Sequence, residues 1–250
     1  MLDLTVIVPC YGRAELTRLL LDSLGACAGR FELILVDDAS PDPVEPLAAR
    51  YRNLLNLRVI RHGSNRGPAA ARNTGLQAAS HRYVAFTDND CVVDPAWAQQ
   101  LATYLRDAPD RVAGVGGRVL GVGTDVFSRY FTYHKILDPY PSAGRYLYVV
   151  TANCAFRREA LEEIGGFDER IQQPGGEDPG LCFKLLQKGW QLHYRKDAVV
   201  HHHYRLGLPD FIQTFFRYGR GCRQQTDAFG VGLGEGEQAS IGFGGMFAEP

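Results

Sequence analysis

The hydrophobic positions of the first 90 residues fall into four short apolar runs, separated by longer segments of helical spacing. The apolar runs predict buried strands over residues 4–9, 31–36, 57–60 and 82–87. The intervening segments predict helices over residues 14–26, 44–51 and 68–79. In the first of them, Leu16, Leu19, Leu20 and Leu24 recur at helical spacing. Strands that alternate with helices predict a parallel sheet wrapped by helices.

The remainder of the chain mixes strands and helices less regularly. Helices are predicted over residues 95–105, 158–164, 179–188 and 209–225, and strands over residues 112–120, 146–150, 153–156, 190–193 and 198–202. Residues 121–143 carry many aromatic side chains and predict a partly helical segment or a mobile loop. The glycine-rich stretch 229–250 has little periodicity, which is typical of a flexible tail. Without an internal repeat or a linker, residues 1–228 are predicted to form a single domain.

The composition is that of a soluble globular protein, with 45% hydrophobic and 22% charged residues. A formal net charge of -1 gives no overall field that would attract nucleic acid or an acidic membrane. The six cysteines include no C-x-x-C pair and mostly lie in apolar segments, which favours a reducing, cytoplasmic setting. No apolar run reaches the ~18 residues of a transmembrane helix, and no secretory signal is evident. Peripheral attachment to a membrane stays open.

Three polar residues, Asp88-Asn89-Asp90, directly follow the fourth apolar run. If the extended backbone continues through Asn89, the carboxylates of Asp88 and Asp90 point to the same side. They would meet at the edge where open α/β sheets bind ligands, and would repel each other unless a cation lay between them. Hard oxygen ligands suit Mg²⁺ or Mn²⁺. The alternative interpretation is a solvated turn, in which Asp and Asn are common.

Charged residues also follow the second and third apolar runs. Asp37 and Asp38 end the second strand, where a carboxylate can accept hydrogen bonds from a ribose hydroxyl or a base N–H. The alternative for this pair is a cap or a turn. Arg66 and Arg72 flank the start of the third predicted helix, and both guanidinium groups and helix starts suit phosphate. The alternative for each arginine is plain surface charge.

The segment Gly175-Gly176-Glu177-Asp178-Pro179 supports two interpretations of one carboxylate. If Pro179 occupies the first helical position, Asp178 is the natural N-cap and has no chemical role. Alternatively, Asp178 is a general base at the edge of a cleft, with the two glycines allowing the backbone to approach a ligand.

Three consecutive histidines, His201-His202-His203, follow the apolar residues of the last predicted strand. Neutral imidazole binds transition metals, so one of the three beside Asp88-Asn89-Asp90 would make a site better suited to Mn²⁺ than to Ca²⁺. Surface or packing histidines are the alternative. The sequence lacks a dinucleotide-binding fingerprint after the first strand, a Walker A motif and a G-x-S-x-G elbow.

A set of short motifs follows a fixed order over roughly residues 4–203. The motifs are Val8-Pro9-Cys10-Tyr11, Val36-Asp37-Asp38-Ala39-Ser40, Asn65-Arg66-Gly67, Ala71-Arg72-Asn73-Thr74-Gly75, Asp88-Asn89-Asp90, Asn153-Cys154-Ala155-Phe156-Arg157-Arg158, Gly165-Gly166-Phe167-Asp168-Glu169, Gly176-Glu177-Asp178 and the histidine run. In this order they resemble the family 2 inverting glycosyltransferases of GT-A fold. The resemblance implies a Rossmann-like α/β fold, with a mostly parallel central sheet flanked by helices and a smaller acceptor-side subregion. It assigns residues 1–110 to a nucleotide-binding half and residues 111–228 to an acceptor and catalytic half.

The resemblance also implies a role for each matching residue. The implied nucleotide-sugar site comprises Pro9, Tyr11, Asp37, Asp38, Arg66, Arg72, Asp88 and Asn89. Asp90 would bind the metal that bridges the diphosphate, Mn²⁺ or Mg²⁺, and Asp88 would lie near the ribose or the metal. The family often has an aromatic residue where His201 stands, which makes His202 the favoured metal ligand. Asp178 matches the catalytic base, and Glu177 its acceptor-side neighbour.

The implied reaction moves one sugar from a nucleoside-diphosphate sugar, of UDP or GDP type, to the hydroxyl of a glycan, lipid-linked or protein acceptor. The metal at Asp90 would neutralise the leaving group while Asp178 takes the acceptor's proton, so that a single displacement inverts the anomeric centre. The processive synthases of this family carry Q-x-x-R-W, whereas this chain has Arg217-Tyr218-Gly219-Arg220-Gly221. This difference favours single-sugar transfer over polymer synthesis.

Two alternative functions remain open. A sugar nucleotidyltransferase has a related fold, but that class of enzyme requires a glycine-rich loop with Arg or Lys directly after the first strand. The segment Pro9-Cys10-Tyr11-Gly12-Arg13 matches that requirement poorly. A non-catalytic module that binds sugar nucleotides or glycans is the second alternative, and the intact Asp90 and Asp178 argue against it.

Overall fold

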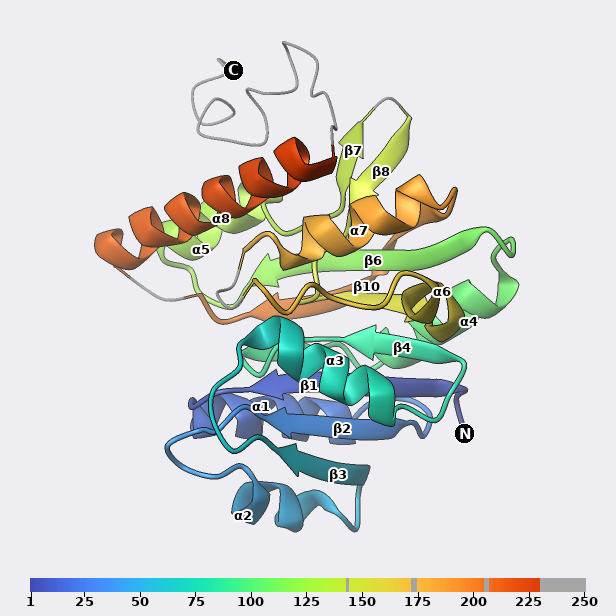
Figure 1. Cartoon of the computed structure of the whole chain (residues 1–250). Coiled ribbons are helices and arrows are strands. Elements are labelled where there is room, and N and C mark those ends of the chain that lie inside the picture. Colours follow the sequence, from blue (N-terminus) through green and yellow to red (C-terminus); the bar gives the residue numbers. More distant parts are fainter. Residues whose placement is uncertain (143, 172–174, 205–206, 230–250) are drawn as a thin grey trace.

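The computed structural model describes residues 1–142, 144–171, 175–204 and 207–229 of the chain (Figure 1). The first elements are β1 (Leu4–Cys10), α1 (Ala14–Gly25), β2 (Glu32–Asp37), α2 (Glu45–Ala48), the 3-10 helix η1 (Ala49–Tyr51), β3 (Asn56–Arg61), α3 (Pro68–Ala78), β4 (Tyr83–Phe86), β5 (Cys91–Val93) and α4 (Trp97–Asp107). They are followed by β6 (Val112–Gly121), α5 (Val126–Tyr133), β7 (Tyr140–Ser142), β8 (Arg145–Tyr148), β9 (Cys154–Arg157), α6 (Arg158–Glu163), α7 (Glu177–Gln187), β10 (Gln191–His202) and α8 (Leu208–Phe229). The flexible tail predicted for residues 229–250 lies, beyond Phe229, outside the described residues.

Eight of the described strands form one sheet in the order β3-β2-β1-β4-β9-β6-β10-β5. Strands β3, β2, β1 and β4 are parallel to one another, and β6 is parallel to β10. Strand β9 runs antiparallel between β4 and β6, and β5 pairs antiparallel with β10 at one edge. The prediction of a mostly parallel central sheet is therefore confirmed, with β9 joining the two halves of the chain.

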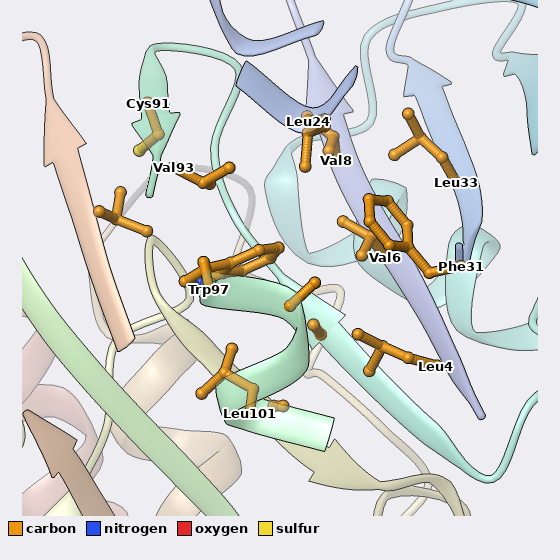
Figure 2. Close-up of a cluster of buried hydrophobic side chains, with 14 of the residues drawn as sticks. Leu4, Val6, Val8, Leu24, Phe31, Leu33, Cys91, Val93, Trp97 and Leu101 are labelled. Atoms are coloured by element: carbon orange, nitrogen blue, oxygen red, sulfur yellow. The ribbon is translucent and has the colours of Figure 1, made fainter. Parts of the chain in front are cut away.

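The side chains of β1 alternate between two apolar cores, one on each face of the sheet. Val6 and Val8 pack with α1 and α4, where Trp97 is fully buried (Figure 2). Ile7 points to the opposite core, which α3, α6 and α7 cover. Gly75 of α3 lies so close to Ile7 that an added Cβ would overlap it, so a larger residue would push this helix off the sheet. Helices thus flank both faces, as predicted.

Among the predicted boundaries that differ from the structure in the second half of the chain, two change the interpretation. The strands predicted at residues 190–193 and 198–202 form one strand, β10, whose pairing with β6 shifts register between Arg195 and Val199. Helix α7 begins at Glu177 because Gly176, with φ 107, is its N-cap. Pro179 is consequently the third helical residue, where its missing N–H has no intrahelical partner to lose. The prediction that Pro179 occupies the first position of this helix was wrong.

The aromatic segment at residues 121–143 contains helix α5, which confirms a partly helical structure. Asp125 begins this helix as an N-cap and accepts hydrogen bonds from the N–H groups of Phe127 and Ser128. The rings of α5 pack against α8, with the ring centroids of Phe127 and Phe211 5.2 Å apart. In the part of the chain that the structure describes, no helix combines the length and apolar character that crossing a membrane requires.

Candidate functional site

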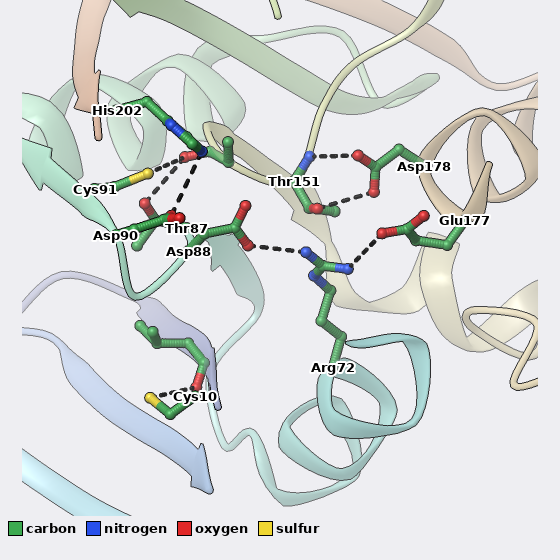
Figure 3. A network of polar contacts seen from close by, with 12 residues as sticks. Cys10, Arg72, Thr87, Asp88, Asp90, Cys91, Thr151, Glu177, Asp178 and His202 are labelled. Carbon is green, nitrogen blue, oxygen red and sulfur yellow. Dashed lines mark hydrogen bonds and ion pairs between the residues drawn. The ribbon is translucent and has the colours of Figure 1, made fainter. Parts of the chain in front are cut away.

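A cavity of about 1040 Å³ opens at the carboxyl ends of β1, β2 and β4. Its lining brings together most of the side chains predicted for the site, namely Pro9, Tyr11, Asp38, Arg72, Asp88, Asn89, Asp90, Glu177, Asp178 and His202. Figure 3 shows Asp88 and Asp90, which follow β4, on one side of Arg72, and Glu177 and Asp178, at the start of α7, on the other. Residues from the two halves of the sequence therefore share one space.

Asp37 is among the predicted residues that do not line the cavity. Its side chain is fully buried and accepts hydrogen bonds from the N–H groups of Ser40 (2.8 Å) and Val44 (3.1 Å), and it pairs with Arg61. Burial raises its pKa, but the hydrogen bonds from Ser40, Val44 and Arg61 outweigh burial and leave the pKa below its ordinary value. This carboxylate stabilises the loop after β2.

Asp38 holds the loop that precedes α3. Its carboxylate accepts hydrogen bonds from the N–H groups of Arg66 and Gly67, both at 2.8 Å, and contacts His62 Nδ1 at 2.7 Å. The guanidinium of Arg66 points elsewhere and pairs with Glu169 at 3.0 Å, so Arg66 does not line the cavity. The sequence interpretation had not singled out His62.

The backbone of Asp88-Asn89-Asp90 turns instead of remaining extended. The carbonyl of Asp88 accepts a hydrogen bond from the N–H of Cys91 at 3.1 Å. The Asn89 amide is buried and donates to Gly12 O and Thr17 Oγ1, both at 3.1 Å. The prediction that the backbone stays extended through Asn89 was therefore wrong. Both aspartates nevertheless line the cavity.

Asp90 and His202 face each other across a short gap that Cys91 also borders. His202 Nε2 lies 3.4 Å from Asp90 Oδ1, and one ligand atom from each of these three residues lies within 4.8 Å of the others. Among the described residues, Asp90 Oδ1 and His202 Nδ1 are buried without a hydrogen-bond partner. The other oxygen of Asp90 pairs with the guanidinium of Arg13. These groups could hold a divalent cation.

The two neighbouring histidines have different surroundings. His201 turns toward Asp94, with its Nε2 3.1 Å from the carboxylate, and does not line the cavity. His203 lines the cavity, and its backbone N–H donates to Asp90 O at 2.9 Å. His202 is accordingly the histidine whose ring lies against the Asp90 carboxylate (Figure 3).

Arg72 bridges the two sides of the cavity (Figure 3). Its Nη2 donates to Asp88 at 2.9 Å and its Nη1 donates to Glu177 at 3.2 Å, while the side chain is almost fully buried. Burial lowers the pKa of Arg72, but Asp88, Asp178 and Glu177 together raise it above its ordinary value. Arg72 is therefore a fixed positive charge among three carboxylates, in the same cavity as Pro9, Tyr11 and Asp38.

Asp178 is not the N-cap of α7, so the capping interpretation was wrong. Its Oδ1 accepts a hydrogen bond from Thr151 Oγ1 at 2.9 Å, and its Oδ2 accepts one from Thr151 N at 3.2 Å. Burial first, and then the charge of Glu177, raise the pKa of Asp178 to about 7, although Arg72 and the Thr151 N–H oppose the rise. A carboxylate that opens to the cavity with this pKa can exchange protons near neutral pH.

Aromatic rings line much of the cavity. Tyr140 and Tyr148 stack with ring centroids 5.5 Å apart, and Tyr146 meets Tyr194 edge to face at 5.9 Å. The rings contributed by α5, α8 and their flanking residues are Tyr130, Phe131, Tyr204, Phe211, Phe215 and Tyr218. Rings from residues 127–140 and from residues 211–218 thus both reach the cavity.

Arg13, Thr151 and Cys91 are among the site residues that sequence reasoning missed. Arg13 could have been suspected, because it follows the first strand and so lies at the same sheet edge as Asp90. Thr151 lies 27 residues before Asp178, between the apolar residues Val150 and Ala152. The sequence holds no pattern that pairs Arg13 with Asp90 or Thr151 with Asp178.

The sequence of this chain is similar to those of known proteins. A family model described as "Glycosyl transferase family 2" matches residues 5–165. The pre-mycofactocin glycosyltransferase of Mycobacterium tuberculosis is 34% identical over 228 residues, which cover 87% of this chain and 46% of that protein. Chondroitin synthase of Escherichia coli is 24% identical, over 80% of this chain and 34% of that protein. The chain therefore spans less than half the length of these relatives.

Solved structures share the fold. A mannosyltransferase from Pyrobaculum calidifontis, in complex with GDP-Man and Mn²⁺, superimposes with a TM-score of 0.68 at 25% identity, covering 92% of this chain and 64% of that one. Residues 1–349 of Staphylococcus aureus TarS, in complex with UDP-GlcNAc, give a TM-score of 0.69 at 20% identity, covering 95% and 70%. The predicted GT-A fold is thereby confirmed. Together with the family match over most of the sheet, these similarities establish that the chain belongs to glycosyl transferase family 2.

Proposed function

We propose that this chain transfers one sugar from a nucleoside-diphosphate sugar to an acceptor hydroxyl with inversion of the anomeric centre. The observation that carries the proposal is the single cavity that joins Asp88 and Asp90 on one wall to Asp178 on the other. The family assignment supports a glycosyltransferase over a sugar nucleotidyltransferase. Solved relatives contain GDP-Man or UDP-GlcNAc, which supports a donor of GDP or UDP type.

The donor would bind on the β1 and β4 side, against Pro9, Tyr11 and Asp38. Asp90 and His202 would hold Mn²⁺ or Mg²⁺, because a buried carboxylate oxygen and an imidazole without full hydrogen bonding suit such a cation. When bound, the cation would supply Lewis-acid neutralisation of the departing diphosphate. The Pyrobaculum relative was solved with Mn²⁺, which supports this choice.

Asp178 would act as the general base. Its carboxylate takes the proton of the acceptor hydroxyl while the acceptor oxygen bonds to the anomeric carbon and the bond from that carbon to the phosphate oxygen breaks. Glu177 is held by Arg72 and by the N–H of Gly175 at 2.6 Å, so its charge stays beside the base and favours proton uptake. The acceptor would lie among the aromatic rings, which offer stacking surfaces for a sugar or another apolar group.

The test is transfer by the chain and by Asp178→Asn with a panel of UDP- and GDP-sugars and Mn²⁺. Donor hydrolysis reports turnover even before an acceptor is found, and NMR of the product reports the anomeric configuration. We expect inversion in the unsubstituted chain and, for Asp178→Asn, unchanged donor affinity with turnover lowered about 10²–10⁴-fold. Binding of donors without any turnover would support the binding-module alternative. Full turnover by Asp178→Asn would overturn the assignment of the base.

A further inference from the structure

The two oxygens of the Asp178 carboxylate are engaged by one residue from another part of the fold. The hydroxyl of Thr151 donates to Oδ1 at 2.9 Å and its backbone N–H donates to Oδ2 at 3.2 Å (Figure 3). Contacts at both oxygens fix the plane of a carboxylate, which one hydrogen bond would leave free to rotate. We infer that Thr151 is the positioning residue for Asp178, an inference that rests on the proposed role of Asp178 as the base.

Thr151 can hold this carboxylate because its own loop is firmly anchored. The loop joins β8 to β9, and the N–H of Asn153 closes it by donating to Val150 O at 3.1 Å. The Asn153 side chain is fully buried and donates to Arg118 O (2.8 Å) and Ala198 O (2.9 Å). It also accepts a hydrogen bond from Trp97 Nε1 at 2.8 Å. Three elements, β6, β10 and α4, thus fix the residue two positions after Thr151.

The side chain of Thr151 adds to this rigidity. It is almost fully buried, and a β-branched side chain has few accessible χ1 rotamers. Its hydroxyl therefore meets Asp178 in one orientation, without the loss of rotamer freedom that a longer donor would suffer. The remaining lone pairs of Asp178 are left for the cavity, where an acceptor hydroxyl would lie.

The charges around Asp178 make a neutral donor useful at this point. The groups whose charges interact with it from the surrounding elements are Glu177, Arg72, Asp88, Cys154, Cys182 and Tyr218. Arg72 is the positive group in this set, and it is already shared between Asp88 and Glu177. Hydrogen bonds from Thr151 favour the ionised form of Asp178 without a second cation that would compete for the neighbouring carboxylates.

The test compares Thr151→Val with Thr151→Ser in the apo chain. Valine keeps the shape of threonine and removes only the hydroxyl, whereas serine keeps the hydroxyl. Because the hydroxyl stabilises the ionised carboxylate more than the protonated one, Thr151→Val should lower the melting temperature more at pH 8.5 than at pH 5. We expect this difference to be about 2–4 °C. Thr151→Ser, which keeps the hydroxyl, should show little of this difference between the two pH values.

Two further variants separate positioning from general loop stability. Thr87→Val is the matched control, because the Thr87 hydroxyl is also buried and donates to Ala152 O at 3.0 Å in the same loop without touching Asp178. Its loss of melting temperature should be the same at both pH values. In the Asp178→Asn background, the pH dependence of the Thr151→Val loss should disappear. A loss that is independent of pH in the unsubstituted background, or one whose pH dependence persists in Asp178→Asn, would overturn the inference.

Kinetics provide the second readout once turnover has been measured. Thr151→Val should raise the pKa of Asp178, moving the acidic limb of the kcat profile to higher pH by about one unit, with the donor KM unchanged. An unmoved limb in Thr151→Val would contradict positioning through Asp178. Full turnover by Asp178→Asn would instead refute the proposed base, whatever Thr151→Val does, so the two failures are distinguishable.

Discussion

The guanidinium of Arg13 forms an ion pair with Asp90, at the carboxylate proposed to hold the metal. Arg13 adopts φ 56, a left-handed conformation that is uncommon for residues other than glycine. A cation and a guanidinium would compete for the same carboxylate. If the proposed metal binds Asp90, it would therefore share this carboxylate with Arg13 and weaken the ion pair.

Removing this competitor should strengthen metal binding. We expect Arg13→Gln to bind Mn²⁺ about two- to fivefold more tightly in the absence of nucleotide, since a partly exposed ion pair is of modest strength. Calorimetric titration with Mn²⁺ measures the change. Arg18→Gln is the matched control, because Arg18 lies on α1, the helix that begins directly after Arg13, and pairs with Glu15 and Asp22, away from the site. Equal or weaker affinity in Arg13→Gln would show that Arg13 does not compete.

Substitution of the proposed ligands should remove the metal dependence of nucleotide binding. In Asp90→Asn and His202→Ala, the gain in UDP or GDP affinity on adding Mn²⁺ should fall at least about tenfold. Titrations with Mn²⁺ and with a chelator measure that gain. His201→Ala is the control, because the His201 ring contacts Asp94 instead. A gain that survives in Asp90→Asn and His202→Ala would place the cation elsewhere.

The raised pKa of Asp178 should make this residue a source of instability in alkaline solution. In the unfolded chain its pKa is near 3.8, and folding raises it to about 7. The folded chain thus binds this proton more tightly, so the contribution of Asp178 to stability falls as the pH rises from about 4 to 7 and stays low above. We expect Asp178→Asn to raise the melting temperature at pH 8.5, with a smaller gain or none at pH 4.5.

Asp168→Asn is the control for this measurement, because folding shifts the pKa of Asp168 in the opposite direction. A hydrogen bond from Arg170 lowers the pKa of Asp168 below its ordinary value, so Asp168 contributes stability that is present at high pH and lost on acidification. Asp168→Asn should accordingly lower the melting temperature at pH 8.5. If Asp178→Asn behaves in the same way as Asp168→Asn, the pKa of Asp178 is not raised in the folded chain.

Gly176 should tolerate substitution poorly because it begins helix α7 in a conformation that side chains rarely adopt. With φ 107, alanine would be strained by ~1–3 kcal/mol, and its Cβ would lie 2.8 Å from the backbone of Gly221 on α8. Gly176→Ala should therefore lose more stability in urea denaturation than Gly189→Ala. Gly189 also has a positive φ, 79, but an added Cβ there meets nothing within 4 Å. Equal losses would show that contact with α8 is unimportant.

The sheet could be predicted from sequence because its signals are local. An apolar run such as residues 31–36 is bounded by charged residues, Arg30 and Asp37, and every strand predicted in the first 90 residues is present in the structure. Strand β5 was missed because three residues, Cys91–Val93, are too few to show a pattern, and their pairing with β10 depends on residues far along the chain. The start of α7 was misjudged because the φ of Gly176, not the position of Pro179, determines it.

The candidate site was predictable only in part, for a related reason. The presence of Asp90, Asp178 and His202 in one cavity followed from motifs that each lie at a strand or helix end. Their partners could not be foreseen, since Arg13 pairs with Asp90 across 77 residues and Thr151 with Asp178 across 27. Such contacts depend on how loops pack after the sheet has formed.

The position of Arg72 between Asp88 and Glu177 has a consequence for how such a chain can diverge. One guanidinium serves both walls of the cavity, so a substitution at Asp88 that suits a different donor also leaves Arg72 free to shift toward Glu177. That shift would change the field at Asp178 and with it the acceptor hydroxyls that the chain can activate. Under the proposed function, donor preference and acceptor reactivity are therefore coupled, and grafting the donor-side residues of another enzyme would require a compensating change at the start of α7.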